Sequence, residues 1–477
     1  MIKEKINTER VFHYFREISK IPRCSKKEEK ISQYLYDWAK SKQLKVIQDR
    51  QLNIIIYKEA TKGYENSPTV ILQGHMDMVC EKNADKIHDF DKDPITLVYK
   101  NDFIYADGTT LGADNGIAVA MILAILESNN LEHPAIEALI TTDEETGMTG
   151  VANLDGSLLN GRIMINLDSG DEGMFLAGCA GGGRLNFSAD IIQEDSRLES
   201  ELKLVIKGLQ GGHSGAEIHL DRGNANKIMG RLLFKIKDLV ELVAIGGGSA
   251  DNAIPREAFA IVKTNHKNEI ENYLNELLTE LKKEYQFSDP GIDMQIEDLD
   301  SKHDKVLSHS MFDRYLNLIN LVPNGPLKIT NELNLVILSN NPGVVKITDN
   351  KLKLTCAPRS SIKSLLHDFA DKMEQLGSIT GFEVEKTAFY PGWEYAKESP
   401  IRDICMDTFK DIFGKEAEVK AVHAGLECGF IMEKVPGLDA ISFGPDMFNL
   451  HSPDEHLSIG STERTYELLN EVIRRIK

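Results

Sequence analysis

Four short apolar runs in the first third of the chain predict buried strands, and three of them end beside side chains that can bind a metal ion. The runs are residues 53–57, 69–72, 135–141 and 162–167, and the side chains that follow the last three are His75, the pair Glu144 and Glu145, and Asp168. Residues 116–129, rich in Ala, Ile and Leu, predict a buried helix between the second and third runs. Strands that alternate with helices predict a largely parallel sheet, which binds its ligands beyond the carboxyl ends of its strands. The sequence therefore predicts an α/β fold with a polar site at one sheet edge.

The chain is long enough for two domains, because 477 residues exceed what one ordinary core occupies. Beyond a glycine-rich segment at 178–183, strands are predicted at 202–207, 258–264, 333–338, 344–348 and 351–356, and helices at 224–243, 268–284 and 361–376. This pattern predicts two similar units, each an antiparallel sheet with helices. We therefore expect residues 1–183 and 399–477 to form one domain, with helices on both faces of its sheet. An inserted α+β lid domain is expected at 184–398.

Composition excludes several classes of partner. A formal net charge of −19 argues against nucleic acid, which requires a basic face. The longest apolar stretch, residues 117–126, has half the length of a membrane span, and the amino terminus lacks the apolar core of a signal peptide. The six cysteines are scattered without a Cys-x-x-Cys pair, which predicts reduced thiols. We expect a cytoplasmic protein that binds neither nucleic acid nor membrane.

Six metal-competent side chains occur in a fixed order along the chain, namely His75, Asp114, Glu144, Glu145, Asp168 and His451. Two imidazoles and three carboxylates can hold a pair of divalent ions about 3.5–4 Å apart and leave one carboxylate as a base. Imidazole favours zinc, cobalt or manganese over calcium. Asp114, in a glycine-flanked turn before the predicted helix, is placed to bridge the ions. Glu145 is assigned to a metal, Glu144 to the bridging water, and Asp77 to the second imidazole nitrogen of His75.

Five segments together resemble the co-catalytic zinc peptidases, a family that includes carnosinases, aminoacylases and glutamate-releasing carboxypeptidases. The segments are Gly74–Asp77, Thr109–Gly116, Thr141–Gly147, Ile165–Asp168 and His451–Glu455. Within the family, the chain looks like the bacterial aminoacyl-histidine dipeptidases, also called cytosolic non-specific dipeptidases, over essentially its whole length. The resemblance implies a zinc-peptidase catalytic domain interrupted by a lid.

The resemblance also implies a role for each candidate residue. One ion takes His75, Asp114 and Asp168, and the other takes Asp114, Glu145 and His451. Glu144 is implied as the acid/base and Asp77 as the residue that orients His75. A cis peptide is implied between Asp114 and Asn115.

Further candidates lie outside the metal ligands. By the resemblance, His213 in Gly211–Gly215 donates to the oxyanion, although a glycine-flanked His alone is more often a surface turn. Asn252 and Arg359 match positions that hold the substrate's carbonyl or carboxylate, and an arginine fork suits a carboxylate. The segment 423–429 departs from the Glu-Gly-Gly of other branches. It leaves open whether His423 and Glu427 contact substrate or brace the loop.

These observations predict a metallo-dipeptidase that hydrolyses unblocked dipeptides, including Xaa-His substrates, with two divalent ions. Zinc is the first expectation for the metal, with cobalt or manganese as alternatives. Two other functions stay open. One is an acylase or deacetylase that cleaves N-acyl amino acids with the same metals, and the other is a non-catalytic metal-binding scaffold. We expect catalysis within one chain, either as a monomer or in a homodimer.

Overall fold

The computed structural model describes residues 8–196, 198–300, 303–330 and 335–477, which form two compact units. The first unit runs to Gly178 and resumes with Tyr395–Ala421 and Leu426–Lys477. The second comprises Cys179–Glu394 and Val422–Gly425. The boundaries expected at 183 and 398 lie a few residues beyond the observed ones, which follow Gly178 and Glu394. Residues 422–425 were expected in the catalytic domain. Two of the predicted site residues, His423 and Glu427, thus fall in different units.

The first unit is built on an eight-stranded sheet in the order β1-β2-β6-β3-β7-β23-β8-β22. Its strands are β1 Lys45–Gln48, β2 Ile54–Lys58, β3 Val70–His75, β6 Ile136–Thr141, β7 Ile163–Asn166, β8 Met174–Cys179, β22 Glu418–Val422 and β23 Asp439–Ser442. The central strands β6, β3, β7 and β23 run parallel, whereas β1, β2 and β8 pair antiparallel with their neighbours. The predicted α/β fold is confirmed, with the parallel order confined to the centre of a mixed sheet.

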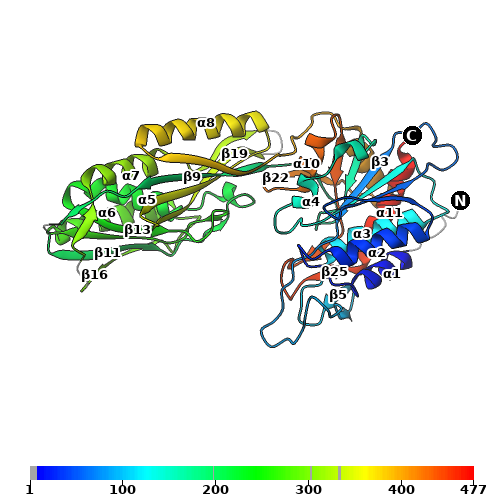
Figure 1. The fold of residues 1–477 in the computed structure, drawn as a ribbon, viewed down its shortest axis with the longest axis horizontal. Coiled ribbons are helices and arrows are strands. Elements are labelled where there is room, and N and C mark those ends of the chain that lie inside the picture. The colour runs from blue at the N-terminus through cyan, green and yellow to red at the C-terminus, as the bar shows by residue number, and fades with distance from the viewer. Residues whose placement is uncertain (1–7, 197, 301–302, 331–334) are drawn as a thin grey trace. The chain divides into compact units, whose positions relative to one another are not determined.

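Both faces of this sheet are covered, and every residue of β3 and β6 is buried. One face packs on the main core with five helices, α1 Glu9–Ile18, α2 Glu29–Ser41, α3 Ala113–Glu127, α9 Pro400–Phe413 and α11 Ile459–Arg475. On the opposite face, Gln73 of β3 donates to Glu427 at the start of α10 (Glu427–Lys434), which packs on α4 (Thr149–Ala152) (Figure 1). Helix α3 is apolar on all sides because it lies in the centre of the core.

A second, four-stranded sheet joins the two ends of this unit. It has the order β24-β25-β5-β4, with β4 Leu97–Lys100, β5 Phe103–Ala106, β24 Met447–Phe448 and β25 His456–Ser458. In its centre Leu457 pairs with Ile104, so the loop after β5 and the loop before β25 start from adjacent strands. These two loops lead to Asp114 and carry His451, two ligand candidates that are far apart in the sequence.

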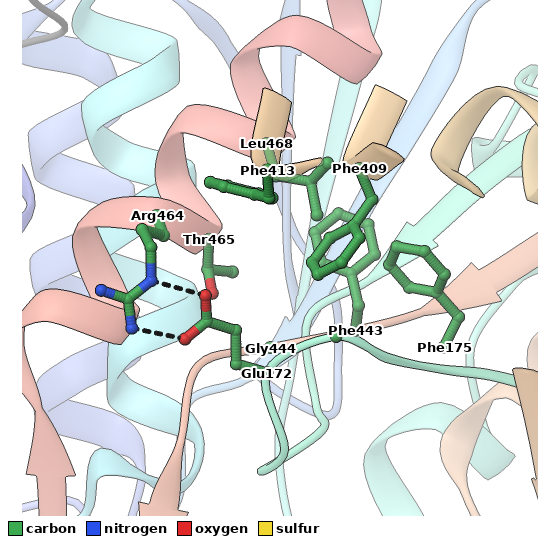
Figure 2. Close-up of a pocket in the computed structure, with 10 residues that line it drawn as sticks. Glu172, Phe175, Phe409, Phe413, Phe443, Gly444, Arg464, Thr465 and Leu468 are labelled. Carbon is green, nitrogen blue, oxygen red and sulfur yellow. Dashed lines mark hydrogen bonds and ion pairs between the residues drawn. The ribbon is translucent and has the colours of Figure 1, made fainter. Parts of the chain in front are cut away.

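A small hollow beside α9 and α11 is aromatic and carries none of the predicted site residues among the described ones (Figure 2). The rings of Phe409 and Phe443 each lie edge-on to Phe175, at centroid distances of 5.9 and 5.4 Å. At its rim Arg464 binds Glu172 through two bonds of 2.6 Å. The hollow is part of the packing of α9 and α11 on the sheet.

The second unit is one continuous antiparallel sheet in the order β16-β11-β15-β13-β19-β20-β9-β21, with β18 paired to β19. Its strands are β9 Gly181–Asp190, β11 Ser200–Lys207, β13 Glu241–Gly247, β15 Ala258–Thr264, β16 Asp293–Asp298, β18 Gly325–Thr330, β19 Leu335–Thr348, β20 Lys351–Ser360 and β21 Glu383–Tyr390. Helices α5 Ala225–Ile236, α6 Lys267–Glu284, α7 His309–Leu321 and α8 Lys363–Thr380 share one core with this sheet and cover one face (Figure 1). The two predicted units are its halves, joined where Gly247 of β13 pairs with Val345 of β19.

Two predicted elements of this unit differ in extent. The helix predicted at 224–243 ends at Ile236, and β13 begins at Glu241, because the β-branched residues of the run 240–248 favour a strand and its glycines disfavour a longer helix. The strands predicted at 333–338 and 344–348 form the single strand β19 from Leu335 onward, with residues 333–334 outside the described part. Pro342 is tolerated there because β19 bulges between Pro342 and Val344. Of the described helices, none is long and apolar enough to cross a membrane.

The prediction that all cysteines are reduced is wrong for one pair. Cys24 and Cys80 form a disulfide, with Cα atoms 5.7 Å apart. The physical reason is a long-range contact that the spacing of cysteines does not reveal, because Cys24 forms a parallel β-bridge with Met78 and so lies beside the segment that follows β3. The other four, Cys179, Cys356, Cys405 and Cys428, are buried thiols.

This pairing predicts the number of titratable thiols. The denatured chain, purified without reductant, is expected to give four thiols with a thiol-specific chromogenic reagent, and six after reduction. The double variant Cys24→Ser/Cys80→Ser serves as the control and should give four in both cases. Six thiols in the unreduced wild type would restore the prediction made from the sequence.

Candidate metal centre

Three neighbouring parallel strands end at the candidate site. His75 is the last residue of β3, Glu144 and Glu145 follow β6, and Asp168 follows β7. Because β6, β3 and β7 are adjacent and parallel, their carboxyl ends lie at one edge of the sheet. The sheet therefore brings together four of the side chains that the sequence singled out.

Asp114 reaches the same edge from the start of α3. Gly112, directly before the helix, has a left-handed φ of +67°, and a side chain there would collide with Arg23. The peptide between Asp114 and Asn115 is cis, as the family resemblance implied. Asn115 accepts from the His75 N–H at 3.2 Å and donates to the Leu167 carbonyl at 2.9 Å, which ties α3 to β3 and to the end of β7.

Two of the three possible ligand groups share one aspartate, Asp114, and the third consists of His75, Glu144 and Glu145. In the first, His75 Nε2 lies 3.1 Å from Asp114 Oδ1 and 3.7 Å from Asp168 Oδ1. In the second, His451 Nε2 lies 3.4 Å from Asp114 Oδ2 and 3.0 Å from Glu145 Oε2. Within each group the ligand atoms lie no more than 4.8 Å apart, and each group could hold a metal ion. The two oxygens of Asp114 point to different groups, which is the geometry that a bridging carboxylate requires.

Asp77 lies beneath this edge and is fully buried. Its Oδ1 is 3.3 Å from His75 Nδ1, the ring nitrogen that faces away from the two groups. Its carboxylate also accepts from the backbone N–H groups of Glu144 (3.1 Å) and Glu145 (3.2 Å) and from the Ser25 hydroxyl (2.8 Å). One carboxylate thus fixes the orientation of His75 and of both glutamates.

The pKa shifts show how strongly these groups act on one another. Burial alone would lower the pKa of His75, but Asp168, Asp114 and Asp77 raise it well above its ordinary value. Hydrogen bonds to Asp114 and Glu145 raise the pKa of His451 to about 10. Both imidazoles are therefore cationic when no metal is bound, and their protons occupy positions that a divalent ion would take. Metal binding at such a site releases protons.

An unpartnered oxygen is a second observation that these ligand side chains fit a metal ion. Glu145 Oε1 is buried and has no hydrogen-bond partner among the described residues, although a buried charged oxygen is costly without one. Burial raises the pKa of Glu144 well above its usual range, with further contributions from Asp168, Glu427 and Glu145. A cation at this edge would satisfy Glu145 and would stabilise the carboxylate form of its neighbour.

Glu427 belongs to the first unit, where it is buried behind β3 and β6 and only 1% exposed. Its Oε2 accepts from Gln73 Nε2 and from the Thr141 hydroxyl, both at 2.6 Å. Burial raises its pKa to about 8, while the positive charge of His75 and the bond from Thr141 oppose the shift. The sequence left the role of this residue open, and these bonds connect it to β3, which ends at His75, and to β6, which precedes Glu144.

The second unit gathers three other predicted residues around Gly215. A Cβ atom at Gly215 would lie 3.0 Å from Arg359 Nε and 3.0 Å from the His213 ring, and would collide with the His423 carbonyl. His423 is bound to the Ser339 hydroxyl at 2.7 Å, and burial followed by the charge of Arg359 lowers its pKa to about 3. Asn252, the fourth candidate, is exposed and lies next to Ala253, the residue that pairs with His213.

Three supporting residues were not predicted from the sequence. Arg23, Ser25 and Glu455 are polar side chains that bind the backbone or the carboxylates of the ligand loops. Glu455 lies in the same motif as His451, so its position in His-Ser-Pro-Asp-Glu was a usable signal. Arg23 and Ser25 lie in a linker between two helices, and nothing in the local pattern distinguishes them.

A parallel-centred sheet whose edge holds two ligand groups around a shared carboxylate defines the class of two-metal hydrolases. The model of Peptidase family M20/M25/M40 matches residues 71–475, and the chain belongs to this family. It is 36% identical over 480 residues to the cytosol non-specific dipeptidase of Escherichia coli (strain K12), across 99% of this chain and 98% of that protein. The resemblance inferred from the five segments is thereby confirmed.

Solved structures agree with this assignment. The crystal structure of aminoacylhistidine dipeptidase from Vibrio alginolyticus matches with a TM-score of 0.93 and 37% identity, covering 99% of this chain and 97% of that chain. The structure of aminopeptidase PepT from Bacillus cereus matches with a TM-score of 0.58 and 16% identity, covering 99% and 100% of the two chains. The second match shows a shared fold.

The buried Glu427 carboxyl predicts a pH dependence of stability in the metal-free protein. Its pKa of about 8 in the fold exceeds its ordinary value of 4.5, so the folded state keeps a proton that the unfolded state has lost between these pH values. The contribution of Glu427 to stability should fall by up to about 1.4 kcal/mol per pH unit as pH rises through this window. Glu427→Gln keeps an acceptor for Gln73 and Thr141 and should flatten this slope in urea unfolding measured from pH 5 to 8. An unchanged slope would contradict the assignment.

Proposed function

We propose that this chain is a metal-dependent dipeptidase that hydrolyses unblocked dipeptides, Xaa-His dipeptides among them. The observation that carries the proposal is the shared aspartate, Asp114, whose two oxygens face two separate imidazole–carboxylate groups. The full-length similarity to a cytosol non-specific dipeptidase and to an aminoacylhistidine dipeptidase supports dipeptides as the substrate class. The first of these names also supports a cytoplasmic location.

The cofactor in this proposal is a pair of divalent ions, zinc before cobalt or manganese. His75, Asp114 and Asp168 would hold one ion, and Asp114, Glu145 and His451 the other. Bound ions at such a site lower the pKa of a shared water and polarise the scissile carbonyl. Borderline-soft imidazole ligands beside carboxylates support zinc, although the same ligands accept the other two metals.

Glu144 is the proposed general base and acid. It takes a proton from the attacking water and passes it to the departing amine, which requires a carboxyl group whose pKa lies above its ordinary value. The burial that raises the pKa of Glu144 supports this role. Asp77 is the proposed orienting residue, because its carboxylate lies 3.3 Å from His75 Nδ1 and Nε2 faces the ligand group.

His213 is the proposed donor to the oxyanion. Its Nδ1 accepts backbone N–H groups from Gly215 (3.3 Å) and Ala216 (2.9 Å), so the proton of the neutral ring is on Nε2. Burial, followed by the charge of Arg359, lowers the pKa of His213 and favours this neutral form. A neutral ring with a fixed Nε2–H is a preorganised donor for developing negative charge.

Arg359 and Asn252 are the proposed substrate-binding residues. Arg359 Nη1 donates to the Tyr390 hydroxyl at 2.8 Å, while its Nε is buried without a hydrogen-bond partner among the described residues. A buried guanidinium with a spare donor suits the free carboxylate of a dipeptide. Asn252, exposed on the neighbouring turn, would bind a substrate carbonyl. His423 and Glu427 are bound to Ser339 and to Gln73 and Thr141, which supports bracing roles for both.

Two alternatives are weaker on these observations. An acylase would use the same metals, but the relatives that match over the full length are named dipeptidases. A non-catalytic scaffold would not need Glu144, which binds no ion in this assignment. We also propose that the inserted unit acts as a lid and that one chain, alone or in a homodimer, supplies all catalytic groups. Small dipeptides are the proposed partners, without nucleic acid or membrane.

The adjacent glutamates should separate catalysis from metal binding. Glu144→Gln removes the base without removing a ligand, so it should bind two ions and lose about 10²–10⁴-fold in kcat on Ala-His. Glu145→Gln weakens a ligand and should lose one ion as well as activity. Metal content by mass spectrometry and dipeptide turnover, measured on both variants, test this contrast. Near-wild-type turnover by Glu144→Gln would refute the assigned base.

Substrate analogues should reveal what Arg359 and the free amino group contribute. Ala-His should be hydrolysed far better than acetylated amino acids, and its carboxamide should react with a roughly 10- to 100-fold lower kcat/KM because the charge-assisted bond to Arg359 is lost. Arg359→Lys should raise KM for Ala-His and reduce the preference for the free acid over the amide.

The matched control for this experiment is Arg231→Lys, which changes an exposed arginine that pairs with Glu280 and Glu284 on the surface of the second unit. This control should keep the wild-type preference. A chain that cleaves acetylated amino acids better than Ala-His would favour the acylase. A metal-loaded chain that cleaves neither would favour the scaffold.

A further inference from the structure

A single carboxylate, that of Glu455, accepts four consecutive backbone N–H groups of the loop that carries Asp114. Its Oε2 accepts from Leu111 (2.8 Å) and Gly112 (3.0 Å), and its Oε1 accepts from Ala113 (2.8 Å) and Asp114 (3.3 Å). The first N–H groups of a helix have no partner within the helix, so α3 alone cannot hold this loop. The side chain is only 2% exposed, and bonds to a carboxylate are stronger than neutral ones.

The same residue is joined to the loop that carries His451. Glu455 lies four positions beyond His451, its N–H donates to the Ser452 carbonyl at 3.0 Å, and β25 begins at the next residue. One side chain therefore connects the two loops whose ligand atoms, Asp114 Oδ2 and His451 Nε2, lie 3.4 Å apart. A shift of either loop would change that separation and would disrupt the second ligand group.

The negative charge of Glu455 is matched by a buried arginine. Arg23, 1% exposed, donates to the carbonyls of Met76 (3.1 Å), Asp77 (3.3 Å) and Gly112 (2.6 Å). Burial lowers the pKa of Arg23 to about 10, and Glu455 is the largest of the charges that oppose this shift. Arg23 is therefore cationic at neutral pH, and it joins the loop of Asp114 to the loop of Asp77.

We propose that Glu455 is a positioning residue that sets Asp114 against His451, with Arg23 as its counter-charge. It binds neither substrate nor metal, and acts by fixing the backbone that presents the shared ligand. The inference rests on the proposed function only in that Asp114 and His451 hold an ion. Residues that orient metal ligands typically contribute 10- to 100-fold to metal affinity or activity.

The test is the zinc affinity of Glu455→Gln. An amide places its NH₂ group against two of the four N–H donors, so the variant should lose roughly 10- to 100-fold in affinity for the more weakly bound ion. Affinity is measured on metal-free protein by competition with a chromophoric chelator, alongside thermal unfolding without metal. In the background of His451→Ala, the further loss caused by Glu455→Gln should be small, because Asp114 then has no His451 against which it must be held.

Two further variants keep the test decisive. Asp454→Asn removes the same charge from the exposed neighbouring residue and should leave affinity unchanged. Glu455→Asp keeps the charge but cannot reach both pairs of N–H groups, so it should show an intermediate loss and serves if the Gln variant does not fold. Unchanged affinity in a folded variant, or failure of both to fold, would overturn the inference. A wild-type chain that binds fewer than two ions would instead refute the proposed function.

Discussion

Five carboxylates converge at one edge of a parallel sheet, and they can stay ionised there only if positive charge lies among them. They are Asp77, Asp114, Glu144, Glu145 and Asp168. Like charges at such separations repel strongly wherever water is scarce. In the metal-free chain the compensation comes from two protonated imidazoles, at His75 and His451, and from the buried guanidinium of Arg23. A site that already requires positive charge is suited to divalent ions.

The need for positive charge among these carboxylates also explains why the glutamates near this edge have different surroundings. Glu145 faces His451 directly and keeps one oxygen without a partner, as a ligand does. Glu144 is aligned through its backbone by Asp77, and burial raises its pKa. Glu427, behind the strands, is also a buried acid with one oxygen unpartnered among the described residues, but its other oxygen accepts from Gln73 and Thr141 and does not face an imidazole. The three glutamates of this unit therefore differ in the groups that their carboxylates and backbones contact.

The site could be predicted from the sequence where local pattern determines position. His75, Glu144 and Asp168 each follow an apolar run that forms a buried strand, and parallel strands place their ends together. The pattern failed where distant contacts decide. The pairing of Cys24 with Cys80 depends on a β-bridge to Met78, and the assignment of residues 422–425 to the second unit depends on packing. The overlong helix at 224–243 shows the remaining ambiguity of a short apolar run, which suits a helix end or a strand equally.

The ligand set also makes assembly of the site depend on both ends of the first unit. Asp114 and His451 come from loops that start at β5 and end at β25, and the pairing of these strands brings the loops together. Contacts so distant in sequence carry a loop-closure cost that must be met before the contacts stabilise the fold. The ligand group of Asp114, Glu145 and His451 is therefore complete only once the carboxyl-terminal segment has packed against β5. Because an ion that binds only the native state stabilises it, metal binding and closure of this unit reinforce one another.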